Sequence, residues 1–334
     1  MTVRFAINGF GRIGRLVLRA IEARNNSDME VVAINDLGDA EMNAYLLKRD
    51  SVHGTFDGSV EAGDGEIRVN GRSIRVLSER DPAKLPWGDL GIDVVMECTG
   101  RFTDADSASA HLDGGAKKVL ISAPAKNVPL TVVYGVNDDK LTAEHSIVSN
   151  ASCTTNCLAP VAKVLHDAIG IERGYMTTVH AYTADQNLQD GLHKDPRRAR
   201  AAALSMIPTS TGAAKAVGLV LPELAGKLDG SAVRVPVPNV SLVDLKVNTA
   251  RPTSAQEIND LMRAAADGPM QGILDVEDEP VVSSDFNHCA ASSTFDTHGT
   301  QVIDGTLARV LSWYDNEWGF ANRMVDTGAK MASL

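Results

Sequence analysis

The sequence predicts an α/β protein in which a doubly wound parallel sheet domain is followed by an α+β domain with a mostly antiparallel sheet. Three observations predict this: a strand–helix–strand pattern at the start, short apolar runs up to about residue 150, and longer alternating runs beyond it. Short, nearly continuous apolar runs are typical of strands covered on both faces, and alternating runs of strands with one exposed face. The length of 334 residues suits two domains.

The first domain is expected at residues 1–150. Val3–Asn8 is a short apolar run, residues 13–21 have apolar positions at helical spacing, and residues 30–36 form a second apolar run. This order predicts two parallel strands joined by a right-handed helical crossover. Further strands are expected at residues 92–98, 118–123, 131–136 and 147–149. Together these runs predict a doubly wound, Rossmann-type sheet.

The second domain is expected at residues 151–316. Its alternating runs cover residues 174–183, 232–249, 281–286 and 306–314. Ser254 and Glu257 form a capping-box pattern ahead of a helix that ends at Gly268. Residues 182–206 lack periodicity, and so long a loop in a compact domain is usually functional. The tail, about residues 317–334, is expected to form a helix that packs back onto the first domain.

Composition and charge exclude several classes of protein. The 43 acidic and 32 basic residues give a net charge of −11, so we expect no nucleic-acid partner. No apolar run reaches the ~18 residues of a membrane span, and we expect no membrane partner. The start of the chain lacks a signal-peptide pattern, and four cysteines are too few for a disulfide framework. We therefore expect a cytoplasmic protein with free thiols.

A glycine motif follows the first predicted strand. Gly9, Gly11 and Gly14 fit the pattern G-x-G-x-x-G at the opening of a helix, where the backbone can approach a pyrophosphate and the helix dipole favours its charge. Asp36 lies 22 residues after Gly14, where its carboxylate can accept both hydroxyls of an adenosine ribose and would repel a 2′-phosphate. The alternative is a glycine-rich turn followed by a solvated aspartate. The motif favours NAD over NADP as the cofactor.

Cys153 is a candidate nucleophile. It is expected at the start of a helix, where unpaired N–H groups and the dipole lower the pKa of a thiol. Two alternatives are a pair of buried structural thiols and a zinc site that includes Cys157, four residues further on. Zinc would need two more ligands, and no Cys/His pair with zinc-like spacing is found elsewhere in the sequence, so we expect no metal.

His180 projects from a predicted strand just before the long loop. Alone it would be interpreted as a hydrogen-bonded core histidine. With Cys153 as a nucleophile, it becomes a candidate base that would form a thiolate–imidazolium pair and then move protons for the reacting oxygen.

Four segments resemble the phosphorylating glyceraldehyde-3-phosphate dehydrogenase family, and the resemblance covers essentially the whole chain. They are Asn8–Gly14, Ala151–Cys157, Pro208–Lys215 and Trp313–Gly319. The resemblance implies a homotetrameric glycolytic enzyme that oxidises D-glyceraldehyde 3-phosphate with NAD and inorganic phosphate to 1,3-bisphosphoglycerate. It also implies a thiohemiacetal and then a thioester on Cys153.

The resemblance further implies a role for individual residues. Cys153 would be the nucleophile and His180 the group that activates it. The residues placed around NAD, besides the three glycines, are Arg12, Ile13, Asp36, Arg80, Ser122 and Asn316. The residues placed around the attacking phosphate are Ser152, Thr154, Thr211 and Gly212, and those around the substrate phosphate are Thr183, Arg198 and Arg234, which could share both anion sites. The family often has tyrosine where this chain has Phe320, whose ring can still pack near a nicotinamide.

Two other functions compete with this interpretation. The first is erythrose-4-phosphate dehydrogenase, a related enzyme that shares the glycines, Cys153 and His180. The region 183–215 resembles the triose enzyme more closely, above all at Ser210-Thr211-Gly212. The second is an NAD-responsive binding protein that has kept the fold and lost the reaction; it would be expected to have lost the thiol or the base, and both are present.

Overall fold

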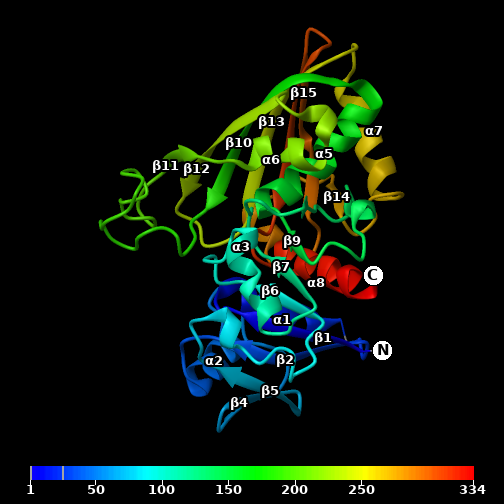
Figure 1. Cartoon of the computed structure of the whole chain (residues 1–334). Helices are drawn as coiled ribbons and strands as arrows, with labels where there is room; N and C mark the ends of the chain where they lie inside the picture. Colours follow the sequence, from blue (N-terminus) through cyan, green and yellow to red (C-terminus); the bar gives the residue numbers. More distant parts are fainter. Residues whose placement is uncertain (1, 25) are drawn as a thin grey trace. The chain divides into compact units, whose positions relative to one another are not determined.

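The computed structural model describes residues 2–24 and 26–334, which divide into two compact units (Figure 1). The first unit comprises residues 1–132, 138–151 and 321–334, and the second comprises residues 133–137 and 152–320. Helix α8, Trp318–Ser333, begins in the second unit and ends in the first. The described part of the chain contains no helix long and apolar enough to cross a membrane.

The first unit is built on a nine-stranded sheet with the order β3-β4-β5-β2-β1-β6-β7-β9-β8. Six of its strand pairs are parallel, and only the hairpins that join β3, β4 and β5 are antiparallel. The expected doubly wound sheet is therefore confirmed. Its strands are β1 Val3–Asn8, β2 Met29–Asn35, β3 Val60–Gly63, β4 Glu66–Val69, β5 Arg72–Leu77, β6 Val94–Glu97, β7 Lys118–Ile121, β8 Leu130–Thr131 and β9 Ile147–Ser149. Its helices are α1 Arg12–Ala23, α2 Ala40–Lys48, α3 Ala105–Ala108 and α4 Ala110–Asp113, with 3₁₀ turns η1 Pro82–Lys84 and η2 Asp138–Lys140.

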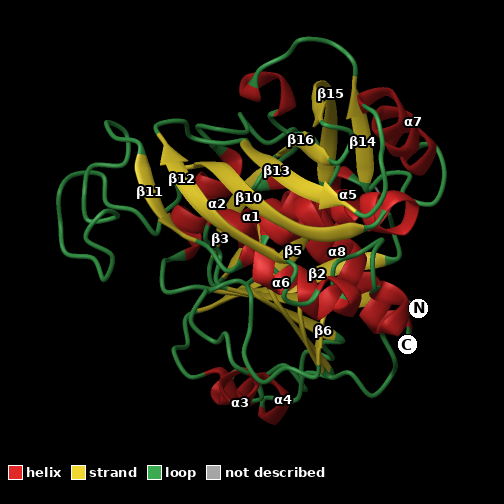
Figure 2. Cartoon of the chain, turned by 90° about the horizontal axis from the view of Figure 1, so that it is seen from above, coloured by secondary structure: helices red, strands yellow, loops and turns green. Residues whose placement is uncertain are grey.

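The second unit is built on a seven-stranded sheet with the order β11-β12-β10-β13-β16-β15-β14. Four of its six strand pairs are antiparallel, as the alternating runs predict. Its strands are β10 Ile171–Ala181, β11 Ile207–Ser210, β12 Leu228–Val235, β13 Ser241–Thr249, β14 Leu274–Glu277, β15 Ser293–Ile303 and β16 Leu307–Tyr314. Helices α5 Cys153–Ile169, α6 Ala213–Val220 and α7 Ala255–Ala266 pack against it (Figure 2), and the 3₁₀ turns are η3 Pro222–Leu224 and η4 Ser283–Phe286.

Three predicted strands differ from the structure. The run 281–286 contains the 3₁₀ turn η4, Ser283–Phe286, instead of a strand, because the Asp285 carboxylate accepts the N–H of Val282 and closes a local turn. The run 232–249 is divided into β12 and β13, since Pro236 and Pro238 cannot donate to a strand ladder. Of the run 131–136, only Thr131 belongs to a strand. The hairpin strands β3–β5 were not predicted at all.

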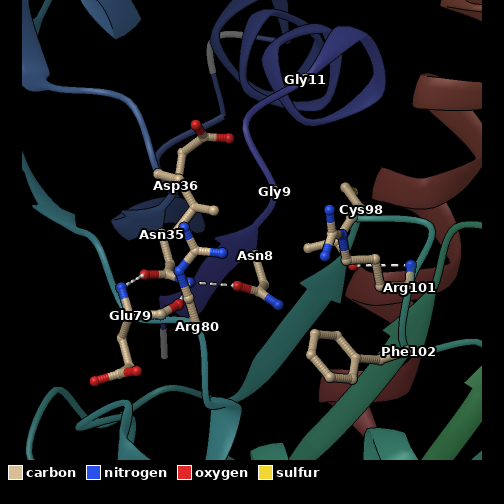
Figure 3. Close-up of a pocket in the computed structure, with 12 residues that line it drawn as sticks. Asn8, Gly9, Gly11, Asn35, Asp36, Glu79, Arg80, Cys98, Arg101 and Phe102 are labelled. Atoms are coloured by element: carbon tan, nitrogen blue, oxygen red, sulfur yellow. Dashed lines mark hydrogen bonds between the residues drawn. The ribbon is translucent and has the colours of Figure 1, made fainter. Parts of the chain in front are cut away.

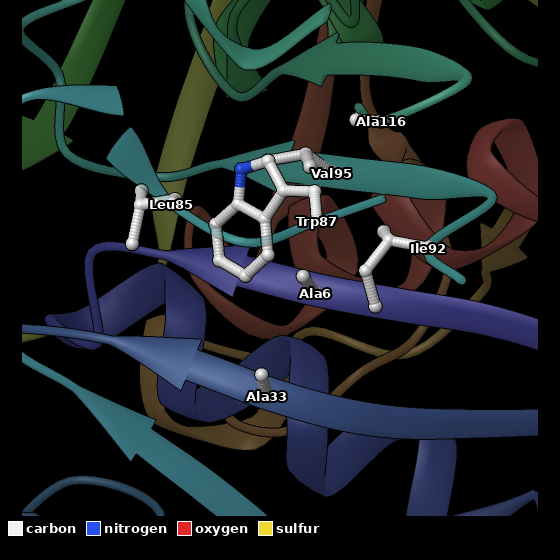
Figure 4. Close-up of a cluster of buried hydrophobic side chains, with 7 residues drawn as sticks. All are labelled: Ala6, Ala33, Leu85, Trp87, Ile92, Val95 and Ala116. Atoms are coloured by element: carbon white, nitrogen blue, oxygen red, sulfur yellow. The ribbon is translucent and has the colours of Figure 1, made fainter. Parts of the chain in front are cut away.

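A buried cluster holds the central strands of the first unit together. Its members are Ala6, Ala33, Leu85, Trp87, Ile92, Val95 and Ala116 (Figure 4). Ala6 of β1 pairs in register with Ala33 of β2 and with Val95 of β6, so the three side chains share one face of the sheet. Trp87 covers them and is completely buried. This packing fixes the carboxyl ends of β1 and β2, where the glycine turn and Asp36 follow.

Candidate active site

The glycine turn after β1 requires its glycines for different reasons. Gly9 has a φ of +89°, and a Cβ there would lie 2.7 Å from the backbone nitrogen of Thr99. A Cβ on Gly14 would lie 2.1 Å from the carbonyl oxygen of Gly9, so this glycine permits the close approach of strand and helix. At Gly11, by contrast, a Cβ would meet no atom of the described residues within 4 Å. The open space at Gly11 fits a ligand that approaches the start of α1.

A pocket of about 400 Å³ lies beside this turn (Figure 3). Asp36 lines it, and its carboxylate accepts the N–H groups of Phe10 (2.8 Å) and Gly38 (3.0 Å). Two backbone donors hold the carboxylate at the rim, where its remaining lone pairs can accept hydroxyl groups. The apolar part of the lining includes Leu37 and Phe102. The residues present therefore fit the adenosine half of a dinucleotide.

The other residues expected around the cofactor are found in different settings. Arg80 lines the pocket and is exposed, and Ile13 is half-buried in the first turn of α1. Ser122 follows β7 and donates its N–H to the carbonyl oxygen of Glu97. Asn316 belongs to the second unit, where its side-chain oxygen accepts the hydroxyl of Ser241 at 2.8 Å.

Arg12 makes a two-pronged ion pair with Asp50, at 2.6 and 3.2 Å. The Asp50 side chain is almost fully buried, which by itself raises the pKa of its carboxyl. The Arg12 guanidinium and the N–H groups of Val52 and His53 outweigh that burial and lower the pKa to about 2. Arg12 therefore anchors the loop after α2 through Asp50. This structural role is separate from the cofactor contact expected from the sequence.

Cys153 is the first residue of α5 in the second unit. Ser152 caps this helix, because its hydroxyl oxygen accepts the N–H of Thr155 at 3.1 Å. Ala151, the residue before the cap, has a φ of +57°, a conformation that residues with a Cβ rarely adopt. This residue directly precedes the cap, and the thiol is placed at the helix N-terminus as the sequence predicts.

His180 near the end of β10 faces this thiol. Its Nε2 lies 3.6 Å from Cys153 Sγ, and the ring is 5% exposed. Its Nδ1 lies 2.7 Å from the carbonyl oxygen of Ala181, which only accepts, and 3.0 Å from a guanidinium nitrogen of Arg234, which only donates, so each neutral tautomer of the ring has a partner at Nδ1. In the tautomer that donates from Nδ1 to Ala181, the lone pair of Nε2 is directed at the sulfur, where it can receive the thiol proton.

Burial decides the charge state of this pair. It raises the pKa of the Cys153 thiol, although the charge of Arg234 and hydrogen bonds at the helix start act in the opposite direction. Burial and the charge of Arg234 also lower the pKa of His180 to about 3. Both shifts favour the neutral thiol and the neutral imidazole, and so oppose the thiolate–imidazolium pair that the sequence analysis expects.

Arg234 on β12 lies next to His180. Its guanidinium donates to the carbonyl oxygen of Ala181 at 2.9 Å and to the hydroxyl of Thr183 at 3.3 Å. Burial and the charge of Arg198 lower its pKa, which shows that two cations share this region. A second positive charge near a buried guanidinium is unfavourable, and the carboxylate of Asp185, which contacts Arg198, offsets part of this repulsion. The structure thus brings Thr183 and Arg234 together as the expected anion site requires.

The remaining expected phosphate residues already have partners. Arg198 contacts Asp185, and its Nε donates to Thr209 at 3.1 Å. Thr211 and Gly212 precede α6, and the Thr211 hydroxyl accepts the N–H of Ala213 at 3.2 Å. Ser152, the cap of α5, is also engaged. Ser152, Thr211 and Gly212 thus lie at two helix starts. Among the described residues, no hydrogen bond joins them or Arg198 to Arg234.

Tyr314 is a functional candidate that the sequence analysis did not assign. Its buried hydroxyl contacts the hydroxyls of Thr154 and Thr178, each at 2.8 Å, and its ring packs edge-on against His180. Tyr314 therefore links the first turn of α5 to β10, which carries the imidazole. Tyr314 lies in the segment 313–319, which carries the family resemblance. Its position in this segment was the sequence feature that could have identified it as a candidate.

A nucleotide pocket on a doubly wound sheet, in one chain with a facing thiol and imidazole, is typical of nicotinamide-dependent dehydrogenases that use a cysteine nucleophile. Comparisons with known proteins narrow this class. Residues 3–105 match the family model described as glyceraldehyde 3-phosphate dehydrogenase, NAD binding domain, and residues 152–316 match its C-terminal domain. The chain belongs to the glyceraldehyde-3-phosphate dehydrogenase family, as its signature segments predict.

Similar proteins cover the whole chain. A glyceraldehyde-3-phosphate dehydrogenase of Xanthobacter flavus is 63% identical over 334 residues, which is 100% of both chains. Proteins of the same name from Cereibacter sphaeroides and Pseudomonas aeruginosa are each 61% identical, and cover 100% of this chain and 100% and 99% of their own length. The expected cofactor, NAD, is thereby confirmed, because the family model matched by residues 3–105 describes an NAD-binding domain.

Proposed function

We propose that this protein catalyses the NAD-dependent oxidation and phosphorylation of D-glyceraldehyde 3-phosphate to 1,3-bisphosphoglycerate. The observation that carries the proposal is the 3.6 Å distance between Cys153 Sγ and His180 Nε2, in a chain of this family. NAD, when bound, supplies a hydride acceptor. Every other step uses side chains of the second unit.

The first step forms a bond between Cys153 and the aldehyde carbon. Because both groups are neutral, the thiol proton passes to His180 Nε2 as the sulfur attacks. Burial and Arg234 disfavour the imidazolium, so the imidazole returns this proton to the new alkoxide oxygen, which gives a thiohemiacetal. The low basicity of the buried ring thus favours release of the proton within the same site.

The second step oxidises the thiohemiacetal to a thioester. The hydroxyl proton moves to His180 Nε2 while the carbon loses a hydride, so the carbon is oxidised by two electrons and the sulfur–carbon bond remains. Inorganic phosphate then attacks the thioester carbon and releases the Cys153 thiolate, with an acyl phosphate as the product. The charge of Arg234, which lowers the pKa of this thiol, favours the thiolate as a leaving group.

We assign the two phosphate groups to the cations and hydroxyls of the second unit. Thr183 and Arg234 already lie within hydrogen-bond distance of each other, which supports one anion site beside His180. Arg198, Thr211 and Gly212, with Ser152 and Thr154 at the start of α5, are proposed for the remaining contacts. Arg198 would have to exchange part of its contact with Asp185 for phosphate.

The direct test is phosphate-dependent formation of NADH from D-glyceraldehyde 3-phosphate, followed at 340 nm. Substrate-dependent NADH production that needs inorganic phosphate supports the proposal. Erythrose 4-phosphate is assayed in parallel, and a higher kcat/KM on that sugar would favour the related enzyme. Binding of NAD without turnover on either sugar would instead favour an NAD-responsive binding protein.

Replacing Asp36 with alanine should relax the preference for NAD over NADP. The wild-type carboxylate lies at the pocket rim and would repel a 2′-phosphate, so its removal should improve kcat/KM for NADP by about tenfold or more relative to that for NAD. Steady-state kinetics with both cofactors measure this ratio. Asp39→Ala, which removes a nearby helix cap instead, is the matched control. An unchanged ratio in Asp36→Ala would show that Asp36 does not select the cofactor.

We further propose that four copies of the chain assemble. The loop 182–206 exposes four large apolar side chains, namely Leu188, Leu192, Leu204 and Met206, and Leu192 is fully exposed. Such a concentration of exposed apolar surface is typical of an interface. Light scattering should give a mass of four chains for the wild type and a smaller one for Leu192→Asp/Leu204→Asp. Leu334→Asp, at an exposed apolar terminus, is the control, and a monomeric wild type would contradict the proposal.

The free thiols of all four cysteines support a reducing, cytoplasmic location.

A further inference from the structure

Glu97, the last residue of β6, carries a carboxylate buried behind the nucleotide pocket; its side chain is 0% exposed. Its Oε2 accepts from Asn8 Nδ2 at 2.6 Å and lies 3.0 Å from His111 Nε2. Its Oε1 accepts the N–H of Thr99 at 2.7 Å and also the Thr99 hydroxyl. Among the described residues, no lysine or arginine pairs with Glu97. The carboxylate therefore depends on these donors for its stability.

The direction of the hydrogen bond from His111 is set by Trp87. The indole Nε1 of Trp87 can only donate, and it lies 3.0 Å from His111 Nδ1. His111 Nδ1 must therefore accept, and the ring hydrogen is carried by Nε2. Both rings are completely buried, so water cannot replace either partner. Nε2 of His111 consequently donates to Glu97.

The direction of the hydrogen bond from Asn8 is set by the backbone of Glu79. The N–H of Glu79 donates to Asn35 Oδ1 at 2.8 Å, and its carbonyl oxygen accepts from Asn35 Nδ2 at 2.9 Å. These two contacts fix which end of the Asn35 amide is oxygen. Asn35 Nδ2 also donates to Asn8 Oδ1 at 2.7 Å (Figure 3). This leaves Asn8 Nδ2 to donate to Glu97.

Two hydrogen-bond chains thus end at Glu97 Oε2, one with Asn8 Nδ2 as its last donor and the other with His111 Nε2. Because both groups donate, the atom at this position must be an acceptor. The first chain begins in the apolar cluster around Trp87, and the second begins at Glu79 in one wall of the nucleotide pocket. Glu97 also holds Thr99, which lies in the opposite part of the lining and whose hydroxyl accepts the N–H of Arg101. Gly9 packs directly on the backbone of Cys98 and Thr99.

We propose that Glu97 is a positioning residue for the dinucleotide: it joins the 79–80 and 99–102 segments of the pocket lining and sets the surface against which the glycine turn packs. The inference rests on the proposed function, because it assigns this pocket to the adenosine half of NAD. Glu97 touches no reacting atom, so its effect is on affinity for the nucleotide and not on the chemical step.

The test replaces Glu97 with glutamine, which has the same shape. Its N–H₂ group must face either the donors of Asn8 and His111 or those of Thr99, and it cannot accept from them. The Kd for NAD and the Kd for ADP-ribose, which lacks the nicotinamide, should rise by the same factor of about tenfold. The kcat at saturating NAD should stay within about twofold of the wild type. Asp296→Asn is the matched control, because it changes a buried carboxylate of the second unit that accepts from Gly299 and Trp313. Its Kd for ADP-ribose should not change.

Unchanged affinities in Glu97→Gln would overturn the inference and leave the proposed function intact, whereas a wild type that binds neither NAD nor ADP-ribose would overturn both.

A second measurement uses the wild-type protein and needs no variant. The ¹⁵N spectrum of histidine-labelled wild-type protein should show His111 with hydrogen on Nε2 alone from pH 6 to 9. Hydrogen on Nδ1 would contradict the proposed direction of the hydrogen bonds, even if Glu97→Gln does not fold.

Discussion

Replacing Cys153 with serine is expected to lower kcat for NADH formation by roughly 10³-fold or more. A hydroxyl ionises far less readily than a thiol, and the neutral imidazole of His180 is too weak a base to compensate. An ester formed on serine would also transfer its acyl group to phosphate more slowly than a thioester. The loss should therefore affect both halves of the reaction.

Pre-steady-state kinetics separate the two halves. The wild type should produce a burst of NADH without inorganic phosphate, as thioester accumulates, and Cys153→Ser should produce none. Cys157→Ser is the matched control: this thiol lies four residues further along α5, is completely buried and contacts Ser293. A serine there should retain the burst. Full activity in Cys153→Ser would refute the assignment of the nucleophile.

Replacing His180 with asparagine should lower kcat by about 10²-fold or more, because Nε2 is the only proton acceptor assigned to both the thiol and the thiohemiacetal hydroxyl. Alkylation of Cys153 by iodoacetamide near pH 7 should also slow. Since the pKa of the thiol is raised by burial, the alkylation rate should keep rising above pH 9 in both proteins. An alkylation rate that matches the wild type at every pH would contradict the role of His180.

The same variant should change the acid dependence of stability. The folded-state pKa of His180, about 3, lies below its ordinary value of 6.5, so the unfolded chain binds a proton that the folded chain does not. The free energy of unfolding should thus be fully retained above about pH 6.5 and fall as the pH drops toward 3. This one group contributes at most about 5 kcal/mol to that fall. His180→Asn should lose less stability than the wild type over the same range.

Urea unfolding at pH 7 and pH 4.5 measures the difference. His166→Asn is the control, because His166 lies half-buried near the end of α5 and accepts the N–H of Ile171 instead of facing the thiol. That variant should follow the acid dependence of the wild type. Equal losses of stability in His180→Asn and the wild type would show that folding does not lower the pKa of this imidazole.

Local patterns predicted the elements that position the site. The glycine turn after β1, Asp36 after β2 and the cysteine at the start of α5 depend on a few neighbouring residues, and the structure places each where its pattern indicates. The β3–β5 hairpins were missed because their strands are four to six residues long and largely exposed, which weakens the apolar signal. The turn at residues 283–286 was missed because Asp285 forms a local hydrogen bond that competes with strand pairing.

The sequence by itself determined the family, the order of its two domains and the residue types that carry the chemistry, since motifs at fixed spacing are local. Only the tertiary structure decided how those residues behave. The charge state of Cys153 and His180 follows from burial and from Arg234, which is 54 residues beyond the histidine along the chain. Likewise, Glu97 acquires its role from Asn8 and His111, which approach it only when β1, β6 and α4 pack together. Desolvation and hydrogen-bond direction depend on distant neighbours, and no local pattern encodes them.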